Sequence, residues 1–150
     1  IGGRYAALTR WDRESTSIAF SGDLRIWSDS APLQLPRCGW EAIQVGNCGP
    51  PIETAEGWLV LTHGVGPMRV YSIGAILLSL ADPSIVRATL THPLLSAAGG
   101  ERDGYVPNVV YSCGALLHDG IVTIPYGISD RSIGFAQVHL SELLGHMDAI

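Results

Sequence analysis

The feature that most constrains the fold is an internal repeat. The run from Gly57 to Val65, GWLVLTHGV, aligns without a gap on residues 120–128, GIVTIPYGI, at a separation of 63 residues. Residues 5–10, YAALTR, align on residues 58–63 at a separation of 53. A second β-rich run follows each copy and starts near Ser17, Ser72 or Ser132. A repeat of about 55 to 65 residues that holds about four short strands has the size of one blade of a β-propeller.

Short runs rich in β-branched and aromatic residues recur along the chain, whereas helical periodicity is scarce. The expected strands cover residues 5–9, 17–21, 58–62, 71–80, 106–112, 121–125 and 132–140. Glycine and proline, with 18 and 9 copies, punctuate these runs. This pattern predicts an all-β fold of the sandwich, barrel or propeller type, and the repeat favours the propeller.

The charge pattern excludes some functions. The formal net charge is −5 and no lysine is present, so the basic stripe typical of nucleic-acid binding is missing. Charged residues make up 15% of the chain, against about 25% in an average protein. We therefore expect this segment to associate, either with copies of itself as a homo-oligomer or with more of its own chain. The longest apolar run, residues 73–80, is too short to span a membrane, and no signal peptide is visible.

The cysteines predict neither a disulfide framework nor a metal site. Cys38, Cys48 and Cys113 are an odd number and show no CxxC spacing or paired histidines. We expect them to be reduced, buried and small hydrophobic residues, which favours a cytoplasmic protein.

The repeat places a polar residue at the end of each equivalent strand: Arg10, His63 and Tyr126. In a propeller, equivalent positions are related by rotation about the central axis, so these side chains could converge on one axial pocket. The alternative is structural, because polar residues commonly end strands where loops begin. The residues alone leave both interpretations open.

A longer run, Ile43 to Val65, IQVGNCGPPIETAEGWLVLTHGV, resembles the signature segment of glycoside hydrolase family 130. Further segments resemble family motifs in the family's order: residues 71–78, 82–84, 104–114 and 126–130. The resemblance implies a five-bladed β-propeller about twice as long as this chain. Residues 1–150 would then be the C-terminal part of a single propeller domain and would supply the last two to three blades, with the other blades upstream.

The family resemblance also implies an activity. Members of family 130 cleave β-mannosides with inversion, by phosphorolysis or by hydrolysis. The implied partners are a mannose-containing oligosaccharide and inorganic phosphate as co-substrate, with no other cofactor and no metal. The aspartate that acts as general acid in the family lies upstream of residue 1, so we expect no catalytic residue in this chain and no activity from residues 1–150 alone.

The resemblance assigns two groups of binding residues. Arg10 and His63 match the phosphate subsite of the family, and Gln44 stands where its phosphorylases usually present a lysine. For substrate binding, Asp130 matches an acidic residue of the family that faces the sugar, and Tyr126 belongs to the same short motif. Asn47 is added from its chemistry alone, because its amide could hydrogen-bond sugar hydroxyls, although asparagine is equally suited to capping a turn.

Phosphorolysis needs a dianion held against the anomeric carbon, and cationic donors raise its local concentration and orient it. A planar guanidinium can bind two phosphate oxygens at once, whereas the neutral amide of Gln44 gives a weaker hydrogen bond than a lysine would. A hydrolase would instead need a carboxylate base, for which Glu41 and Glu53 are candidates, although such turn residues are commonly solvated. We therefore expect a β-mannosyl phosphorylase, with a β-mannosidase or a non-catalytic carbohydrate-binding propeller as alternatives.

Overall fold

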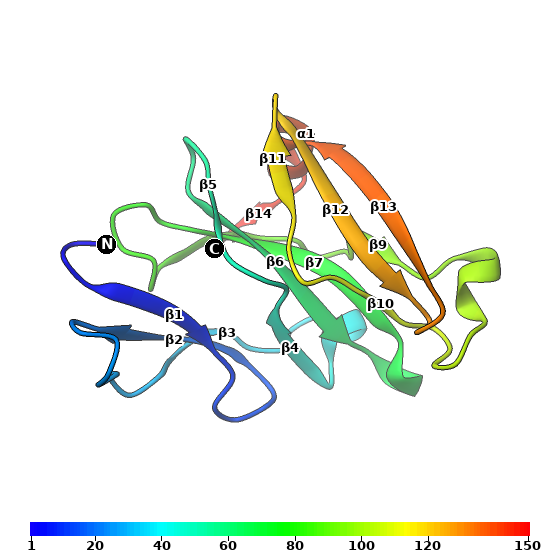
Figure 1. The fold of residues 1–150 in the computed structure, drawn as a ribbon, viewed down its shortest axis with the longest axis horizontal. Coiled ribbons are helices and arrows are strands. Elements are labelled where there is room, and N and C mark those ends of the chain that lie inside the picture. Colours follow the sequence, from blue (N-terminus) through cyan, green and yellow to red (C-terminus); the bar gives the residue numbers. More distant parts are fainter.

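The computed structural model describes residues 1–150 and is nearly all β (Figure 1). The strands are β1 (Tyr5–Thr9), β2 (Thr16–Ser21), β3 (Ala31–Gln34), β4 (Gln44–Asn47), β5 (Ile52–Glu53), β6 (Trp58–Val65), β7 (Tyr71–Leu78), β8 (Val86–Thr89), β9 (Leu95–Ser96), β10 (Val110–Tyr111), β11 (Leu116–His118), β12 (Ile121–Ile128), β13 (Ser132–His139) and β14 (Asp148–Ala149). The helical elements are short: η1 (Gly39–Glu41), η2 (Pro67–Arg69), η3 (Gly99–Arg102) and α1 (Leu140–Gly145). None of these helices is long and apolar enough to cross a membrane.

The strands form three antiparallel sheets that follow one another along the chain (Figure 1). The first sheet has the order β1-β2-β3. In the second sheet β4 and β5 both pair with β6, which is followed outward by β7, then β8 and β14, while β9 also pairs with β7. In the third sheet β10 and β11 both pair with β12, and β13 lies on the other side of β12.

The sequence repeat corresponds to the same strand in each sheet. Its three copies are β1, β6 and β12, and each pairs with the strand that follows it, β2, β7 or β13. In the second and third sheets the strand before this pair is interrupted in the middle, as β4/β5 and β10/β11. The prediction of an all-β chain built from blade-sized repeats is confirmed.

The core lies on both faces of the second sheet. A cluster of 13 buried residues, among them Leu59 and Leu61 of β6, fills the space toward the third sheet. A smaller cluster, which includes Val60, packs against residues of the first sheet such as Leu8. Every residue of β6 from Leu59 to Val65 is therefore buried, and the strand that carries His63 is held from both sides.

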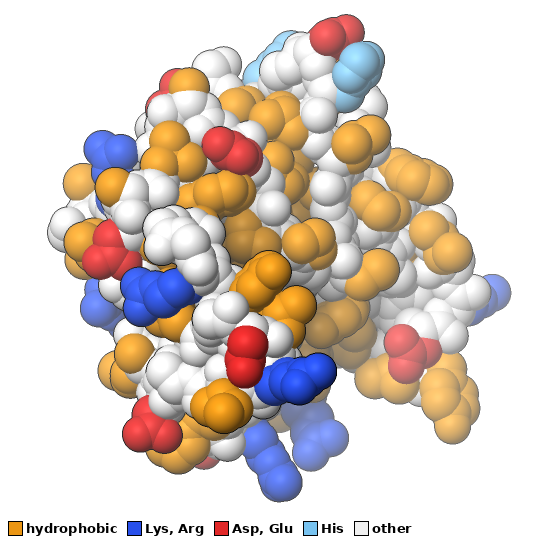
Figure 2. Space-filling view, turned by 60° about the vertical axis from the view of Figure 1, so that its left-hand side comes forward, with side chains coloured by type: hydrophobic (Ala, Val, Ile, Leu, Met, Phe, Trp, Pro, Cys, Tyr) orange, Lys and Arg blue, Asp and Glu red, His pale blue; other side chains and the backbone are white.

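The accessible surface is larger than that of a compact domain and includes many hydrophobic side chains. The accessible surface is 8378 Å², against about 7,400 Å² for a compact monomer of 16.0 kDa. Large hydrophobic side chains are exposed, including Ile133 and Phe135 of β13. Figure 2 shows hydrophobic side chains spread over one face of the molecule, with charged side chains scattered among them. The low charged fraction of the sequence thus corresponds to apolar surface.

Some local predictions are wrong. The strand expected over residues 106–112 is limited to Val110–Tyr111, because Pro107 has no N–H to donate and Asn108 has a φ of 60°. The final predicted strand stops at His139, because α1 begins at Leu140. All three cysteines are free, as expected, but only Cys48 is buried, whereas Cys38 is half-buried and Cys113 is exposed.

Candidate functional site

Arg10 and His63 meet across the α-carbon of Gly46. Arg10 directly follows β1, whereas His63 lies in β6 opposite Gly46 of β4. A Cβ atom at Gly46 would lie 2.6 Å from Cδ of Arg10 and 2.6 Å from Cε1 of His63. Only glycine leaves room for both side chains at this position. The first and second sheets therefore bring a guanidinium and an imidazole together.

The loop after β1 is fixed to the second sheet. The Val45 N–H of β4 donates to the Glu14 carbonyl with an N···O distance of 2.8 Å. Within the loop, Asp12 accepts the Glu14 N–H at 3.0 Å, and Nη2 of Arg10 donates to the Arg13 carbonyl at 2.6 Å. These bonds hold the arginine beside β4.

The Arg10 guanidinium carries a charge that no carboxylate neutralises. The only ion pair within 4.0 Å in the chain is the exposed His118–Asp119 pair. The Nε atom of Arg10 is buried and has no acceptor. Buried donors and charges are normally paired, so an orphaned donor of this kind fits an anionic ligand.

His63 is buried between two tyrosines. Its side chain is 2% exposed, and its ring centroid lies 6.4 Å from that of Tyr71 and 5.0 Å from that of Tyr111. Burial, and then the positive charge of Arg10, lower the pKa of His63 from 6.5 to about 4. The ring is therefore neutral at pH 7, and an anion beside it would raise its pKa again.

A thiol lies next to the imidazole. Sγ of Cys48 is 3.8 Å from Nδ1 of His63. Burial raises the pKa of Cys48 to about 12, so this thiol stays protonated and adds no negative charge beside Arg10.

The same two tyrosines line a cavity of about 560 Å³ between the second and third sheets, together with Asn108 and Asp130. The Tyr71 N–H donates to the Asn108 carbonyl at 3.1 Å and joins β7 to the segment before β10. Asp130 lies in the turn between β12 and β13 with a φ of 51°, which aspartate tolerates better than most residues. The hydroxyl of the buried Ser129 donates to the Glu101 carbonyl at 2.6 Å and anchors this turn.

The side chains of the other three predicted residues, Tyr126, Asn47 and Gln44, do not hydrogen-bond to Arg10 or His63. The hydroxyl of Tyr126 donates to Oε1 of Glu101 at 3.0 Å. Nδ2 of Asn47 donates to the Gly49 carbonyl at 3.1 Å, within its own turn. Gln44 is half-buried, and because side chains alternate along a strand it lies on the same face of β4 as Gly46.

The structure thus brings Arg10, His63 and Gln44 to one side of β4 and places Asp130 in the neighbouring cavity. Sequence reasoning did not identify Tyr71 and Tyr111 as neighbours of His63, because no pattern within either strand points to that contact. Glu41, considered as a base, is 3% exposed rather than solvated and lines a different cavity.

The fold and this geometry define a segment of a β-propeller with a polar site where its blades meet. Residues 1–149 match the family described as "beta-1,4-mannooligosaccharide phosphorylase". A 1,2-beta-oligomannan phosphorylase from Thermoanaerobacter sp. (strain X514) is 41% identical over 145 residues, which are 95% of this chain and 49% of that protein. A beta-1,2-mannobiose phosphorylase from Listeria innocua is 36% identical over 155 residues, 99% of this chain and 44% of that protein.

A solved structure supports the same relationship. The beta-1,2-mannobiose phosphorylase from Listeria innocua in complex with beta-1,2-mannobiose superposes with a TM-score of 0.89 at 35% identity, over 97% of this chain and 43% of that one. The chain belongs to glycoside hydrolase family 130, and its sheets are blades of the five-bladed β-propeller of that family. It spans about half the length of the curated relatives that it matches.

Proposed function

We propose that this chain carries the phosphate subsite of an inverting β-mannoside phosphorylase, with Arg10 and His63 as its donors. The observation that carries this proposal is the buried, unpartnered Nε of Arg10 beside His63 and Gly46. The two relatives of this chain described above are named as phosphorylases of β-mannosides. A cationic site with no carboxylate within 4.0 Å of the arginine suits phosphate better than it suits a water molecule and its base.

The chemistry follows from the position of the anion. Phosphate held by Arg10 would attack the anomeric carbon on the face opposite the leaving sugar, so a β-mannoside would give α-mannose 1-phosphate. The guanidinium can bind two phosphate oxygens. The negative charge of the bound dianion would raise the pKa of the His63 imidazole. Gln44 would act as a third donor, neutral and therefore weaker than a lysine.

On the sugar side, we propose that Asp130 accepts hydrogen bonds from mannose hydroxyls in the cavity lined by Tyr71 and Tyr111. Asn47 keeps one amide proton for a sugar oxygen, since only one bond to Gly49 is made. Tyr126 would act more indirectly, through Glu101. A β-1,2-linked mannoside is the first substrate to test, because the names of the two relatives above specify that linkage.

For the whole protein, we propose one propeller domain in which upstream blades provide the general acid. The free cysteines, including the exposed Cys113, fit a reducing compartment, and we propose a cytoplasmic location. Homo-oligomerisation, suggested by the exposed apolar side chains, stays a prediction.

The test is an assay of the full-length protein on β-1,2-mannobiose and β-1,4-mannobiose, with and without phosphate. We expect mannose 1-phosphate to form only when phosphate is present. Release of two free mannose units, independent of phosphate, would reject phosphorolysis and support a β-mannosidase. Binding of the disaccharide without turnover would support a non-catalytic propeller.

A further inference from the structure

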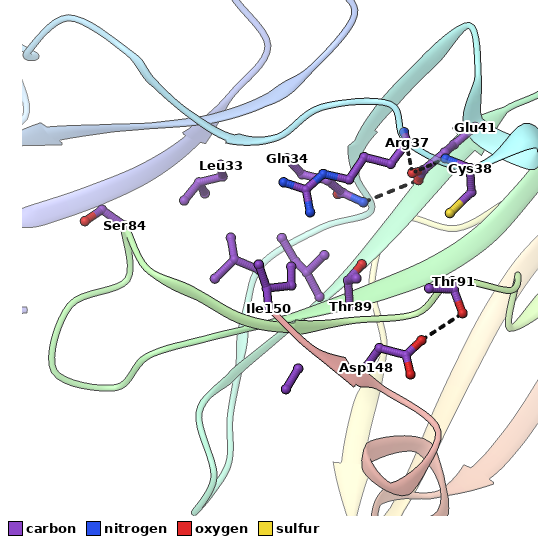
Figure 3. A pocket seen from close by; sticks show the side chains of 13 residues that line it. Leu33, Gln34, Arg37, Cys38, Glu41, Ser84, Thr89, Thr91, Asp148 and Ile150 are labelled. Atoms are coloured by element: carbon purple, nitrogen blue, oxygen red, sulfur yellow. Dashed lines mark hydrogen bonds between the residues drawn. The ribbon is translucent and has the colours of Figure 1, made fainter.

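A second cavity lies at the junction of the first and second sheets, on the side of the molecule where β3, β8 and β14 come together (Figure 3). Its volume is about 550 Å³, which is within the range of small-molecule sites. It shares no lining residue with the cavity of Tyr71, Tyr111 and Asp130. The proposed phosphorolysis does not use this second cavity.

One polar atom is orphaned at the wall of this cavity, and a second lies on the neighbouring strand, outside the lining. Gln34, at the end of β3, is 8% exposed, and its Oε1 is buried without a donor. Thr16 pairs with Gln34 across β2 and β3, is fully buried, and its Oγ1 also has no partner. Because buried polar atoms are normally satisfied, the orphaned oxygen of Gln34 indicates that a ligand with a hydrogen-bond donor fits here.

Glu41 is a buried carboxylate with unused acceptor capacity. Its Oε1 accepts the backbone N–H groups of Arg37 and Cys38 at 3.0 and 3.2 Å. Its Oε2 accepts only Nε2 of Gln34, at a long 3.4 Å. Burial raises the pKa of Glu41, which means that the charged form lacks full compensation. Further donors from a ligand would stabilise the carboxylate.

The rim adds a free donor and further polar groups. The side chain of Arg37 is exposed and makes neither an ion pair nor a hydrogen bond within the chain. Figure 3 shows its guanidinium directed into the same space as the side chain of Gln34. Across the cavity, Asp148 accepts the Thr91 hydroxyl at 2.9 Å. Leu33 and Ile76 supply apolar surface.

The charges and polar groups of the residues that line this cavity favour one class of ligand. Two carboxylates, Glu41 and Asp148, disfavour a polyanion, and the free Arg37 disfavours a polycation. Acceptors and donors arranged around apolar side chains suit a neutral molecule that has several hydroxyl groups on a carbon ring. We propose that this cavity is a second sugar-binding site, which takes one hexose unit of a neutral oligosaccharide between the first two blades of the chain.

Such a site would act by holding substrate near the protein. An oligosaccharide bound here by one unit is kept at a raised local concentration for the separate site at Arg10. This goes beyond the proposed phosphorolysis, which needs only the other cavity, and it can be tested by binding alone.

The experiment uses the full-length protein with ¹³C-labelled isoleucine and leucine methyl groups. β-1,2-Mannobiose and mannose are titrated separately, so that a site for an oligosaccharide unit is distinguished from one for the free monosaccharide. We expect saturable shifts of the Leu33 and Ile76 methyl signals. Arg37→Ala should weaken the affinity read from these methyl groups at least tenfold, since a charge-assisted donor is lost.

Arg25→Ala is the matched control, because Arg25 is also exposed and its side chain has no partner. It should leave the affinity unchanged. Methyl signals of Leu33 and Ile76 that do not respond to either sugar, or an Arg37→Ala variant that binds like the wild type, would overturn the proposal. Phosphorolysis is measured on the same samples. If no phosphorolysis is found but the Leu33 methyl signals still shift, the proposed function fails and the second sugar-binding site is retained.

Discussion

His63 and Tyr126 occupy the same place in the sequence repeat but have different surroundings. Each lies near the end of a long strand, β6 or β12, and is followed by glycine. His63 lies against Arg10 and the bare α-carbon of Gly46. Tyr126 instead donates its hydroxyl to Glu101 of η3. The same position in the repeat therefore packs against a cationic arginine in one blade and anchors a loop in the next.

The difference originates outside the repeated strand. In the second sheet Gly46 lies opposite His63, whereas in the third sheet Tyr111 lies opposite Gly127, one residue away from Tyr126. The strand pattern fixes the side from which each side chain projects. The neighbouring strand and loop then decide which partner it meets.

The largest effect is expected from Gly46→Ala. The new methyl group would overlap Cδ of Arg10 and Cε1 of His63, so both side chains must move. We expect a stability loss of about 1–3 kcal/mol and a fall of about 100-fold in kcat/KM for phosphate, because small displacements at a reacting site are costly. Steady-state kinetics of the full-length enzyme and urea denaturation measure both.

Gly22→Ala is the control for this change, because no atom lies within 4 Å of a Cβ at Gly22. If Gly46→Ala kept wild-type phosphate kinetics, Arg10 and His63 would not form the anion site.

The next effect concerns the pH dependence of stability. The pKa of His63 is about 4 in the folded chain and 6.5 when exposed. As the pH falls from 6.5 to 4, the unfolded state binds this proton before the folded state does, so stability decreases in that window. Relative to His63→Gln, the wild type should lose up to about 3 kcal/mol across it. Equal pH slopes in urea titrations of the two proteins would contradict the burial of a neutral imidazole.

Gly134→Ala tests whether Tyr126 has a structural role that is separate from the anion site. A Cβ atom at Gly134 would lie 2.7 Å from Cζ of the Tyr126 ring. We expect a stability loss of about 1–3 kcal/mol from this overpacking, with the KM for phosphate unchanged. A raised KM for phosphate, seen in the same assay as for Gly46→Ala, would mean that Tyr126 belongs to the anion site after all.

The smallest effect is expected from Tyr126→Phe. It removes the hydrogen bond to Glu101 but keeps the ring, and such bonds contribute about 0.5–1.5 kcal/mol. Thermal denaturation should show a correspondingly small decrease in Tm. A change in phosphate affinity larger than the change in stability would contradict the role of Tyr126 as an anchor of the loop.

Sequence reasoning predicted the elements that have a strong pattern of their own. The long strands β6, β7, β12 and β13 alternate or run apolar over eight residues, and their repeat gave the blade architecture. Two-residue strands such as β5 and β9 carry no such pattern, because pairing with a neighbour defines them. The helix α1 was missed because its six residues are too few to show a helical period.

The site was predictable in part. Arg10 and His63 were found from the repeat and from the family motif, and the structure brings them together. Tyr71 reaches His63 from the paired strand β7, and Tyr111 reaches it from the third sheet. Both contacts depend on how strands and sheets pack together, which the pattern of a single strand does not show. Likewise, the inward direction of Glu41 follows from its bonds to the backbone of the turn before it, not from its type as a charged residue.

The most direct test of the anion site is a diffraction experiment on crystals of the full-length protein soaked in arsenate, a phosphate analogue whose arsenic gives an anomalous signal. The account predicts one strong peak within hydrogen-bonding reach of the Arg10 guanidinium and the His63 ring. A peak elsewhere with this site empty, or no peak at a concentration that supports turnover with phosphate, would contradict it.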